Sequence, residues 1–596
     1  MIVKMKKASL VIMEDYRETA LDALREIGVL HIEKKSGTSE DLSTLIEQRT
    51  AQEKAILLLP KNENSVTEGP KRSMPEVTSK VLALFEESKA IQDDLEKLRK
   101  EQEKLQVWGD FNPIDIEKLK EKGITVRLYN TTVEDFENLP KDIYTVIFSR
   151  TKYNVQFASV FLPGTIIPDI KELPLPEQGL TEIAKIISEK QHRREEIDTQ
   201  MEALSQYREA MKAYITRLDE KIEFEEAKIS TEKEAELAFL TGYIPEKKVQ
   251  LLKETAVRKG WALLIQEPGD DDTVPTLIEN PKAIRIIKPI FDFLATVPGY
   301  KEFDISFWFL IFFTVFVAMI IGDAGYGFIF LIIAVVAKIK MSKSQPSEPI
   351  TLLIVLSLAT IIWGAITGTW FGSEALSELW LFSWMIFEPV ASFNKNSSNL
   401  IKQICFYLGV VHLSIAHIKS FIKLMPSLKA VAQVGWLVMI WGLFFLIMNI
   451  VLSKPLNPVA PYLIFSGFAA IIVFSEQEGN FFKGLLKGLA GLLLKVLNSV
   501  SAFADIISYV RLFAVGLATV EIAKSFNTMV SGLGSSIFGI IAAAIILVLG
   551  HGLNIAMSTL SVVVHGIRLN MLEFSGHLGM EWTGVPYKPF QSKTST

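Results

Sequence analysis

Charged residues are very unevenly distributed along this chain, and that unevenness restricts its fold more than any other feature. Residues 301–596 contain only 31 Lys, Arg, Asp and Glu, whereas residues 1–300 contain 98. Soluble domains have roughly one charged residue in four, so the second half does not resemble one. The sequence therefore predicts a soluble domain over 1–300 and a membrane domain over 301–596, and it excludes a soluble globular enzyme.

The membrane half contains apolar runs of the length that crosses a bilayer, which takes about 20 residues. Six such runs occupy residues 305–322, 324–338, 350–371, 400–418, 431–452 and 459–475. Two further segments, 496–530 and 537–573, keep helical character for about 35 residues each, or roughly 50 Å. Because a hydrocarbon core is about 30 Å thick, these helices must tilt strongly or project from the membrane. We expect eight spans, with the last two long and tilted.

The loops between these spans differ in charge from one side of the membrane to the other. Loops after spans two, four and six carry eight lysines, and the opposite loops carry three lysines together with Glu374, Glu378 and Glu388. The positive-inside rule therefore places residues 1–300 in the cytoplasm, as does the lack of an apolar signal-peptide region at the N-terminus. We expect a multi-pass membrane protein, with a lysine-bearing amphipathic helix over 481–497 on the membrane surface.

Several classes of site are excluded by what the sequence lacks. The soluble half is acidic, with 44 Lys and Arg against 54 Asp and Glu, so we expect no nucleic-acid partner bound through a basic face. A single cysteine, Cys405, rules out a disulfide framework and a cysteine-built metal site. The chain has no Gly-Lys dipeptide, which the phosphate-binding P-loop requires. We therefore expect no ATP hydrolysis site, no cofactor and no metal.

The soluble half alternates between α/β patterns and long-helix patterns. Strand-like and helix-like stretches predict α/β lobes over residues 1–35, 107–170 and 237–275. Apolar residues about every 3.5 positions over 77–106 and 180–236 predict two long helices that fold back on each other as an antiparallel coiled coil. The predicted fold class is mainly α, with cytoplasmic α/β lobes joined by a coiled coil and followed by eight transmembrane helices.

The membrane half contains only two arginines, and each lies inside one of the two long helices. A guanidinium at membrane depth costs about 2.5–3.5 kcal/mol on insertion scales and is normally kept for function. Arg511 has apolar sequence on both sides, so snorkelling to the headgroups does not account for it. For Arg568, which lies closer to the cytoplasmic end of its helix, snorkelling is a serious alternative. We predict that both arginines carry the chemistry.

Polar residues in the last helix form a stripe. They follow one another at steps of three or four residues and so share one face with Arg568: His551, Asn554, Ser558, Ser561 and His565. Such a stripe is typical of hydrogen bonds between helices or of one wall of a hydrated path. We predict the path, and three acids at membrane depth are further candidates for its walls: Asp323, Asp505 and Glu521. For Asp323 a simple turn between two spans is the competing interpretation, and the isolated His412 is interpreted as structural.

The chain resembles a known family, the large membrane subunit of V/A-type rotary ATPases, called subunit a or I. The resemblance lies in DIISYVRLFAVGLA (505–518), GHGLN (550–554), VHGIRLNMLEF (564–574), PYKPF (586–590) and MIIGDAGYG (319–327). The order of parts matches over essentially the whole chain, although the soluble half is similar mainly in layout. The sequence departs from the family at HLGMEWTG (577–584), so no family role is carried over to Met580, Glu581 or Trp582.

This resemblance implies a function and a set of partners. Arg511 and Arg568 would face a rotating ring of proteolipid subunits, whose carboxylates exchange H⁺ or Na⁺ through two half-channels lined by the candidates above. The soluble half would meet the peripheral stalks and the cap subunit of the central stalk. The chain would then be a stator subunit in a prokaryotic cell membrane, surrounded by lipid and without an ATP hydrolysis site of its own.

Two other classes of protein compete with this interpretation. A secondary ion transporter with a cytoplasmic coiled-coil regulatory domain would need inverted repeats and broken helices, and the spans show no convincing repeat. A scaffold without an ion path would leave two costly arginines unexplained. The sequence leaves the choice between H⁺ and Na⁺ open, because the ligands that select the ion would lie mainly on the ring.

Overall fold

Contacts within the chain divide it into two units, and the boundary between them does not lie at residue 300. The computed structural model describes residues 1–35, 37–61, 73–140, 143–163, 165, 170–341, 347–394, 397–477, 479–533 and 536–592. One unit comprises Met1–Ser9, Val29–His31 and Thr241–Pro589, and the other comprises Leu10–Gly28, Ile32–Leu240 and Phe590–Thr596. Residues 241–300 therefore belong to the unit of the apolar helices, although their composition is that of the soluble half.

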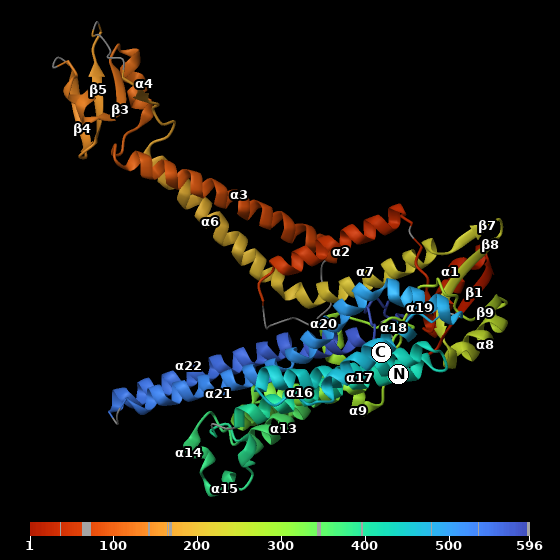
Figure 1. Ribbon diagram of the computed structural model, residues 1–596. Coiled ribbons are helices and arrows are strands. Elements are labelled where there is room, and N and C mark those ends of the chain that lie inside the picture. The colour runs from red at the N-terminus through yellow and green to blue at the C-terminus, as the bar shows by residue number, and fades with distance from the viewer. Residues whose placement is uncertain are drawn as a thin grey trace. The chain divides into compact units, whose positions relative to one another are not determined.

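The second of these units is built mainly from helices. They are α1 (Arg17–Ile27), α2 (Glu40–Leu58), α3 (Met74–Gln106), α4 (Pro113–Glu121), α5 (Val133–Glu137), α6 (Leu180–Leu204) and α7 (Arg208–Ile229), with short 3₁₀ turns at Glu14–Tyr16 and Ser205–Tyr207. α3 and α6 lie side by side (Figure 1). Buried apolar residues of both share one core: Val81, Leu84, Ile91, Leu95, Ile183, Ile187 and Ile197.

Two ion pairs show the relative direction of α3 and α6. Lys190 Nζ lies 2.8 Å from Asp94 Oδ2, and Arg193 Nε lies 2.8 Å from Glu87 Oε1. Residue numbers rise along one helix as they fall along the other, so the pair is antiparallel, as the sequence predicts. That the two helices supercoil stays a prediction.

The helix α2 was not predicted. Its buried residues are few and include a polar one: Leu42, Gln52, Ala55 and Ile56. This face gives no clear apolar period in the sequence, yet it packs against α7 and α3. The partner of α7 is therefore α2 to a greater extent than α3.

A four-stranded antiparallel sheet follows α3 in the chain. Its strands are β3 (Thr125–Thr132), β4 (Tyr144–Arg150), β5 (Asn154–Phe161) and β6 (Glu172–Leu173), in the order β4-β5-β3-β6. Thr125 pairs with Phe161, and the register continues to Thr132 opposite Asn154. This sheet lies within the predicted α/β lobe of residues 107–170, apart from its last strand, β6.

The N-terminal segment forms the predicted strand, helix and strand. Its sheet has the order β2-β8-β1-β9, with β7 paired to β8. The strands are β1 (Met5–Met13), β2 (His31–Ile32), β7 (Glu232–Glu234), β8 (Leu237–Pro245) and β9 (Ala262–Gln266), and the short helix η3 (Glu246–Lys248) and the helix α8 (Val249–Lys259) lie between the last two. Gly28 ends α1 at φ +61°, a left-handed conformation that glycine adopts without strain.

The apolar unit contains most of the remaining helices. They are α9 (Lys282–Arg285), α10 (Lys288–Leu294), α11 (Ser306–Ile321), α12 (Ala324–Lys340), α13 (Glu348–Thr367), α14 (Glu374–Ser377), α15 (Trp380–Ser383), η4 (Glu388–Val390), α16 (Ser397–Leu424), α17 (Lys429–Leu452), α18 (Ala460–Phe474) and α19 (Phe481–Ala490). Within the described residues, five helices are long and apolar enough to cross a membrane, and α11 and α18 are shorter apolar helices. The count of eight spans stays a prediction.

Two very long helices close the chain, as the sequence predicts. The first covers Leu492–Ser531 and consists of α20 (Leu492–Ser508) and α21 (Val510–Ser531). The second covers Ile537–His577 and consists of α22 (Ile537–Ser561), two π-helical segments at Val562–Gly566 and Leu569–Phe574, and α23 (Ser575–His577). α21 and α22 lie side by side (Figure 1). Their tilt relative to a membrane stays a prediction.

Candidate functional site

The two arginines of residues 301–596 converge on one carboxylate. Arg511 of α21 places Nη2 4.0 Å from Glu573 Oε1, and Arg568 of the last helix places Nε 3.6 Å from the same oxygen. The Glu573 side chain is 4% exposed, whereas those of Arg511 and Arg568 are 23% and 53% exposed. The structure therefore brings both predicted arginines together around a buried acid that sequence reasoning did not single out.

The π-helical turn explains this convergence. In an α-helix residues five apart do not share a face, but a π-helix forms i to i+5 hydrogen bonds and places such residues above one another. Arg568 and Glu573 are five apart, and the segment Leu569–Phe574 is π-helical. π-Helical turns inside α-helices occur frequently at functional sites.

Some buried polar atoms at this cluster make no hydrogen bond within the described residues. Within the described residues, four buried polar atoms of the two long helices have no hydrogen-bond partner, and two of them belong to this cluster: Arg511 Nη1 and Glu573 Oε2, with His565 Nδ1 and Asn570 Oδ1 on the last helix. Buried polar groups are nearly always paired, so several unpaired atoms at one place mark a site where another group binds or passes. The two guanidiniums can therefore accept a further anionic partner.

Two residues of the predicted stripe, Asn554 and His551, belong to a hydrogen-bond network with α12 and α21. Asn554 Nδ2 donates to Tyr326 Oη (3.0 Å) and to the Thr519 carbonyl (2.8 Å). Tyr326 Oη lies 2.7 Å from His551 Nδ1, whose Nε2 lies 3.2 Å from Asn527 Oδ1. Because Tyr326 accepts from the amide, its proton goes to His551 Nδ1, and Nε2 then donates to Asn527.

The rest of the stripe continues toward the arginines. Ser558 donates to the Asn554 carbonyl at 2.7 Å, and its hydroxyl lies 3.4 Å from that of Thr519. Ser561 and His565 follow on the same helix and are half-buried. The hydrogen-bonded part of the polar stripe thus reaches from His551 to Ser558, and Ser561 and His565 lie between it and Arg568 along the last helix.

The carboxylate of Asp323 is held by the backbone. Its Oδ1 accepts hydrogen bonds from the amides of Gly325, Tyr326 and Phe371, and its Oδ2 accepts from Gly372, at 2.8–3.2 Å. The side chain is fully buried and caps the N-terminus of α12. This geometry matches the turn interpretation, in which Asp323 fixes the connection between spans.

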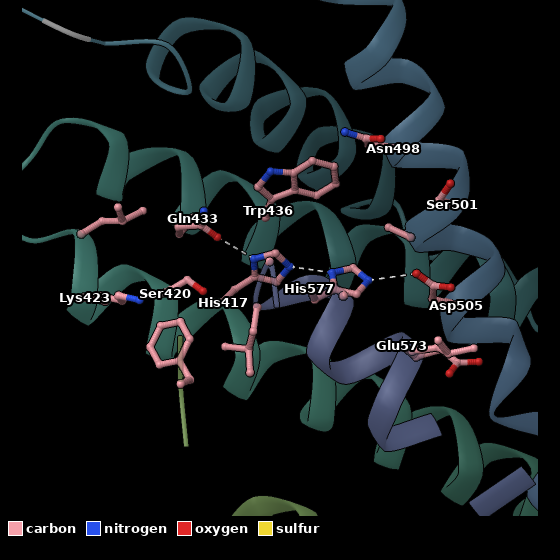
Figure 2. A pocket seen from close by; sticks show the side chains of 17 residues that line it. His417, Ser420, Lys423, Gln433, Trp436, Asn498, Ser501, Asp505, Glu573 and His577 are labelled. Atoms are coloured by element: carbon pink, nitrogen blue, oxygen red, sulfur yellow. Dashed lines mark hydrogen bonds and ion pairs between the residues drawn. The ribbon is translucent and has the colours of Figure 1, made fainter. Parts of the chain in front are cut away.

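Asp505 lines a cavity of about 520 Å³ between α16, α17, α20 and the end of the last helix. Figure 2 shows a chain of hydrogen bonds across it, from Gln433 through His417 and His577 to Asp505. Gln433 Oε1 lies 2.8 Å from His417 Nδ1, His417 Nε2 lies 2.9 Å from His577 Nδ1, and His577 Nε2 lies 3.1 Å from Asp505 Oδ2. Glu573 lines the same cavity.

The direction of these hydrogen bonds assigns their protons. With the Gln433 oxygen toward His417, His417 Nδ1 must donate, so its Nε2 accepts from His577. His577 Nδ1 then donates to His417, and His577 Nε2 faces the Asp505 carboxyl group. The cavity wall thus contains a hydrogen-bonded imidazole pair beside a carboxyl group.

Two further candidates lie outside this arrangement. Glu521 is exposed on α21 and is not joined to the arginine cluster by the hydrogen bonds and ion pairs described above. His412 is fully buried between the rings of Phe312 and Phe574, with centroids 3.9 and 4.2 Å away, and its Nδ1 lies 2.9 Å from Tyr509 Oη. Such a sandwiched ring is a packing element, as predicted for this histidine.

Comparison with known proteins places the chain among relatives of one kind. A V-type ATP synthase subunit I from Borreliella burgdorferi is 37% identical over 99% of both chains, and V-type ATP synthase subunit I 1 from Treponema pallidum is 30% identical over 100% of both. An A-type ATP synthase subunit I from Methanocaldococcus jannaschii is 26% identical over 59% of this chain and 55% of its own.

Solved structures and family models add little to these relatives. A crystal structure of the cytoplasmic N-terminal domain of subunit I, homolog of subunit a, of V-ATPase matches 44% of this chain and 99% of its own length, with 14% identity and a TM-score of 0.22. No family model matches the chain.

Proposed function

This chain belongs to the V-type and A-type ATP synthase subunit I family, and we propose that it is the stator subunit that carries ions past a rotating proteolipid ring. A V/A-type ATPase contains other subunits, and the ring is the partner that the arginine cluster fits. The observation that carries the proposal is the convergence of Arg511 and Arg568 on one buried carboxylate, with Arg511 Nη1 left without a hydrogen-bond partner among the described residues.

The cluster acts through charge. A ring carboxylate crosses lipid only in a neutral form, bound to its ion, because an unpaired charge there is prohibitively costly. Beside two guanidiniums the ionised form is stabilised, and the ion is released. Arginine is suited to this task because a guanidinium keeps its proton, whereas a buried ammonium can lose it.

We assign the two half-channels to the two polar regions beside this cluster. The cavity with Asp505, His577 and His417 supplies the cytoplasmic one, and the stripe from His551 to His565 supplies the other. Asp323 fixes the connection before α12 at the far end of that stripe, so its part is to hold the wall in place. Because the two paths meet only at the arginines, an ion passes from one to the other only when the ring turns.

The remaining parts of the chain serve the stator role. We propose that residues 1–300 form the cytoplasmic domain and contact the peripheral stalks and the cap of the central stalk. Residues 301–596 then form the ion-translocation domain in a prokaryotic cell membrane, with eight spans in contact with lipid. Family membership leaves the alternative of a secondary transporter without support.

The proposal is tested by changing Arg511 in the assembled enzyme. In liposomes, Arg511→Lys and Arg511→Ala should lower ATP-driven ion uptake by at least about 100-fold, which corresponds to roughly 2.7 kcal/mol. The complex should still assemble, because Arg511 is partly exposed and its ion pair is long. Pumping that persists in either variant at more than half the normal rate would contradict the assignment.

A further inference from the structure

Glu573 occupies a position between two parts of the site. On one side, its Oε1 lies within 4.0 Å of nitrogens from both Arg511 and Arg568. On the other side, Glu573 lines the cavity that contains the His417, His577 and Asp505 chain (Figure 2). No other residue described above combines these two positions.

The unpaired atoms of Glu573 and Arg511 indicate that the partners of these side chains can change. Glu573 Oε2 is buried and, within the described part of the chain, has no hydrogen-bond partner, and the same holds for Arg511 Nη1. A carboxylate that served only to neutralise two guanidiniums would be expected to make short, paired hydrogen bonds to them. Here the contacts are 3.6 and 4.0 Å, so neither arginine is locked to Glu573.

The side chains of the two arginines are partly exposed, whereas that of Glu573 is buried. Glu573 is almost fully buried, whereas half of the Arg568 side chain and about a quarter of the Arg511 side chain are exposed. A ring carboxylate can therefore approach the guanidiniums from outside the subunit while Glu573 approaches from inside.

We propose that Glu573 is a proton carrier between the cavity and the ring carboxylate, and that the two carboxylates alternate as partners of Arg511 and Arg568. The inference rests on the proposed function and adds a residue and an ion to it. The ion is H⁺, because the cavity that reaches Glu573 is lined by imidazoles, which pass protons along hydrogen bonds.

The step balances in protons and charge. While a ring carboxylate holds the guanidiniums, Glu573 has lost its counter-charge and takes one proton from a hydronium ion in the cavity, which is left as water. When the ring advances, the O–H bond of Glu573 breaks, its proton goes to the departing ring carboxylate, and the Glu573 carboxylate returns to the arginines. Two guanidiniums face one carboxylate at each stage, and one proton moves from cavity to ring.

Several ionisable groups surround Glu573 and set the pH at which it works. Arg511, Asp505 and Tyr509 belong to the preceding long helix, and Arg568, His565 and His577 belong to its own. From α16, His412, His417 and Lys423 face the same region or the cavity. The pH dependence of transport therefore reports on Glu573 only when Glu573 itself is changed.

The test uses the whole enzyme in liposomes and compares Glu573→Gln with Glu573→Asp. Gln keeps the shape of the side chain but carries no proton, so we expect ATP-driven proton uptake to fall about 100-fold, the order of a lost general acid or base. Asp keeps an acid on a shorter arm, so transport should persist, and its pH profile should shift. Glu581→Gln, an exposed acid in the same C-terminal segment, is the matched control and should transport normally.

The outcomes separate this inference from the proposed function. Proton uptake above half the normal rate in Glu573→Gln overturns the inference. A loss of proton uptake in Glu573→Asp that is equal at every pH also overturns it, because such a loss indicates an effect on packing alone. Sodium-dependent uptake that Glu573→Gln leaves unchanged overturns it as well. In each case Arg511→Lys still tests the arginine contact by itself. If Glu573→Gln does not assemble, the pH profile of Glu573→Asp decides.

Discussion

At the scale of single residues, one carboxylate offsets the charge of two arginines within apolar helices. A guanidinium in an apolar surrounding is costly unless a counter-charge is near, and Glu573 serves Arg511 and Arg568 together. Because the contacts are long and the arginines are partly exposed, the pairing does not exclude an outside partner. An arginine pair sealed by short hydrogen bonds within its own chain would not suit contact with a ring.

Asp323 is a buried acid of another kind, because four backbone amides donate to its carboxylate, and we predict that its role is structural. Asp323→Asn keeps the shape but places an amide hydrogen against a backbone N–H, so we expect a loss of about 1–3 kcal/mol of stability. Thermal unfolding of the purified complex measures this loss, and ion uptake per assembled complex should change little. Normal stability combined with lost transport would make Asp323 an ion carrier instead.

The sequence showed part of this cluster and not the rest, for physical reasons. Arg511 and Arg568 were visible because arginine is rare in apolar helices. Glu573 was hidden because its distance of five residues from Arg568 suits a shared face only in a π-helix, which no periodicity announces. His417 and His577 were hidden because they meet from positions 160 residues apart.

At the scale of elements, long helices with strong patterns were predictable, and those without were not. The α3 and α6 pair follows an apolar period of about 3.5 residues, so its existence and direction could be predicted. α2 buries a glutamine among few apolar side chains, and its helix could not be read from the pattern. The stripe from His551 to Arg568 was predicted on an α-helical period, although π-helical turns lie within and after its last part.

The ion pairs between α3 and α6 make the stability of this helix pair, called the arm below, depend on pH. The hydrogen bond from Arg193 lowers the pKa of Glu87 below its usual value of 4.5, so the folded arm binds this proton less readily than the unfolded chain. The stabilisation is therefore present above pH 4.5 and is lost as the pH falls through the lowered pKa. Since both side chains are exposed, the effect is small.

Arg193→Gln should remove this part of the acid sensitivity. We expect hydrogen exchange of α3 and α6, corrected for intrinsic rates, to accelerate less between pH 6 and pH 3 in the variant than in the normal protein. Lys185→Gln is the control, because within the described residues Lys185 forms its ion pair with Glu189 of its own helix. Equal acid sensitivity in Arg193→Gln and the normal protein would show that the pair does not contribute.

At the scale of the whole molecule, the composition and the contacts divide the chain differently. Charge falls at residue 300, whereas the contacts assign residues 241–300 to the apolar unit. The strand-like C-terminal tail helps to explain this, because Thr276 pairs with Pro586 and Val297 with Thr583. Such pairings join segments about 300 residues apart and leave no local signal in the sequence.

Disulfide cross-linking in the assembled enzyme determines whether the proteolipid ring faces Arg511 and Arg568. Val564 and Leu572 flank Arg568 on the last helix and are 50% and 61% exposed, whereas Tyr462 of α18 is 76% exposed. The natural Cys405 is buried, so introduced cysteines report with little background. We predict that Val564→Cys and Leu572→Cys form disulfides with cysteines placed next to the ring carboxylate, and that Tyr462→Cys does not. Cross-links from Tyr462→Cys alone, or none from the two arginine-flanking positions in an assembled enzyme, would contradict the account.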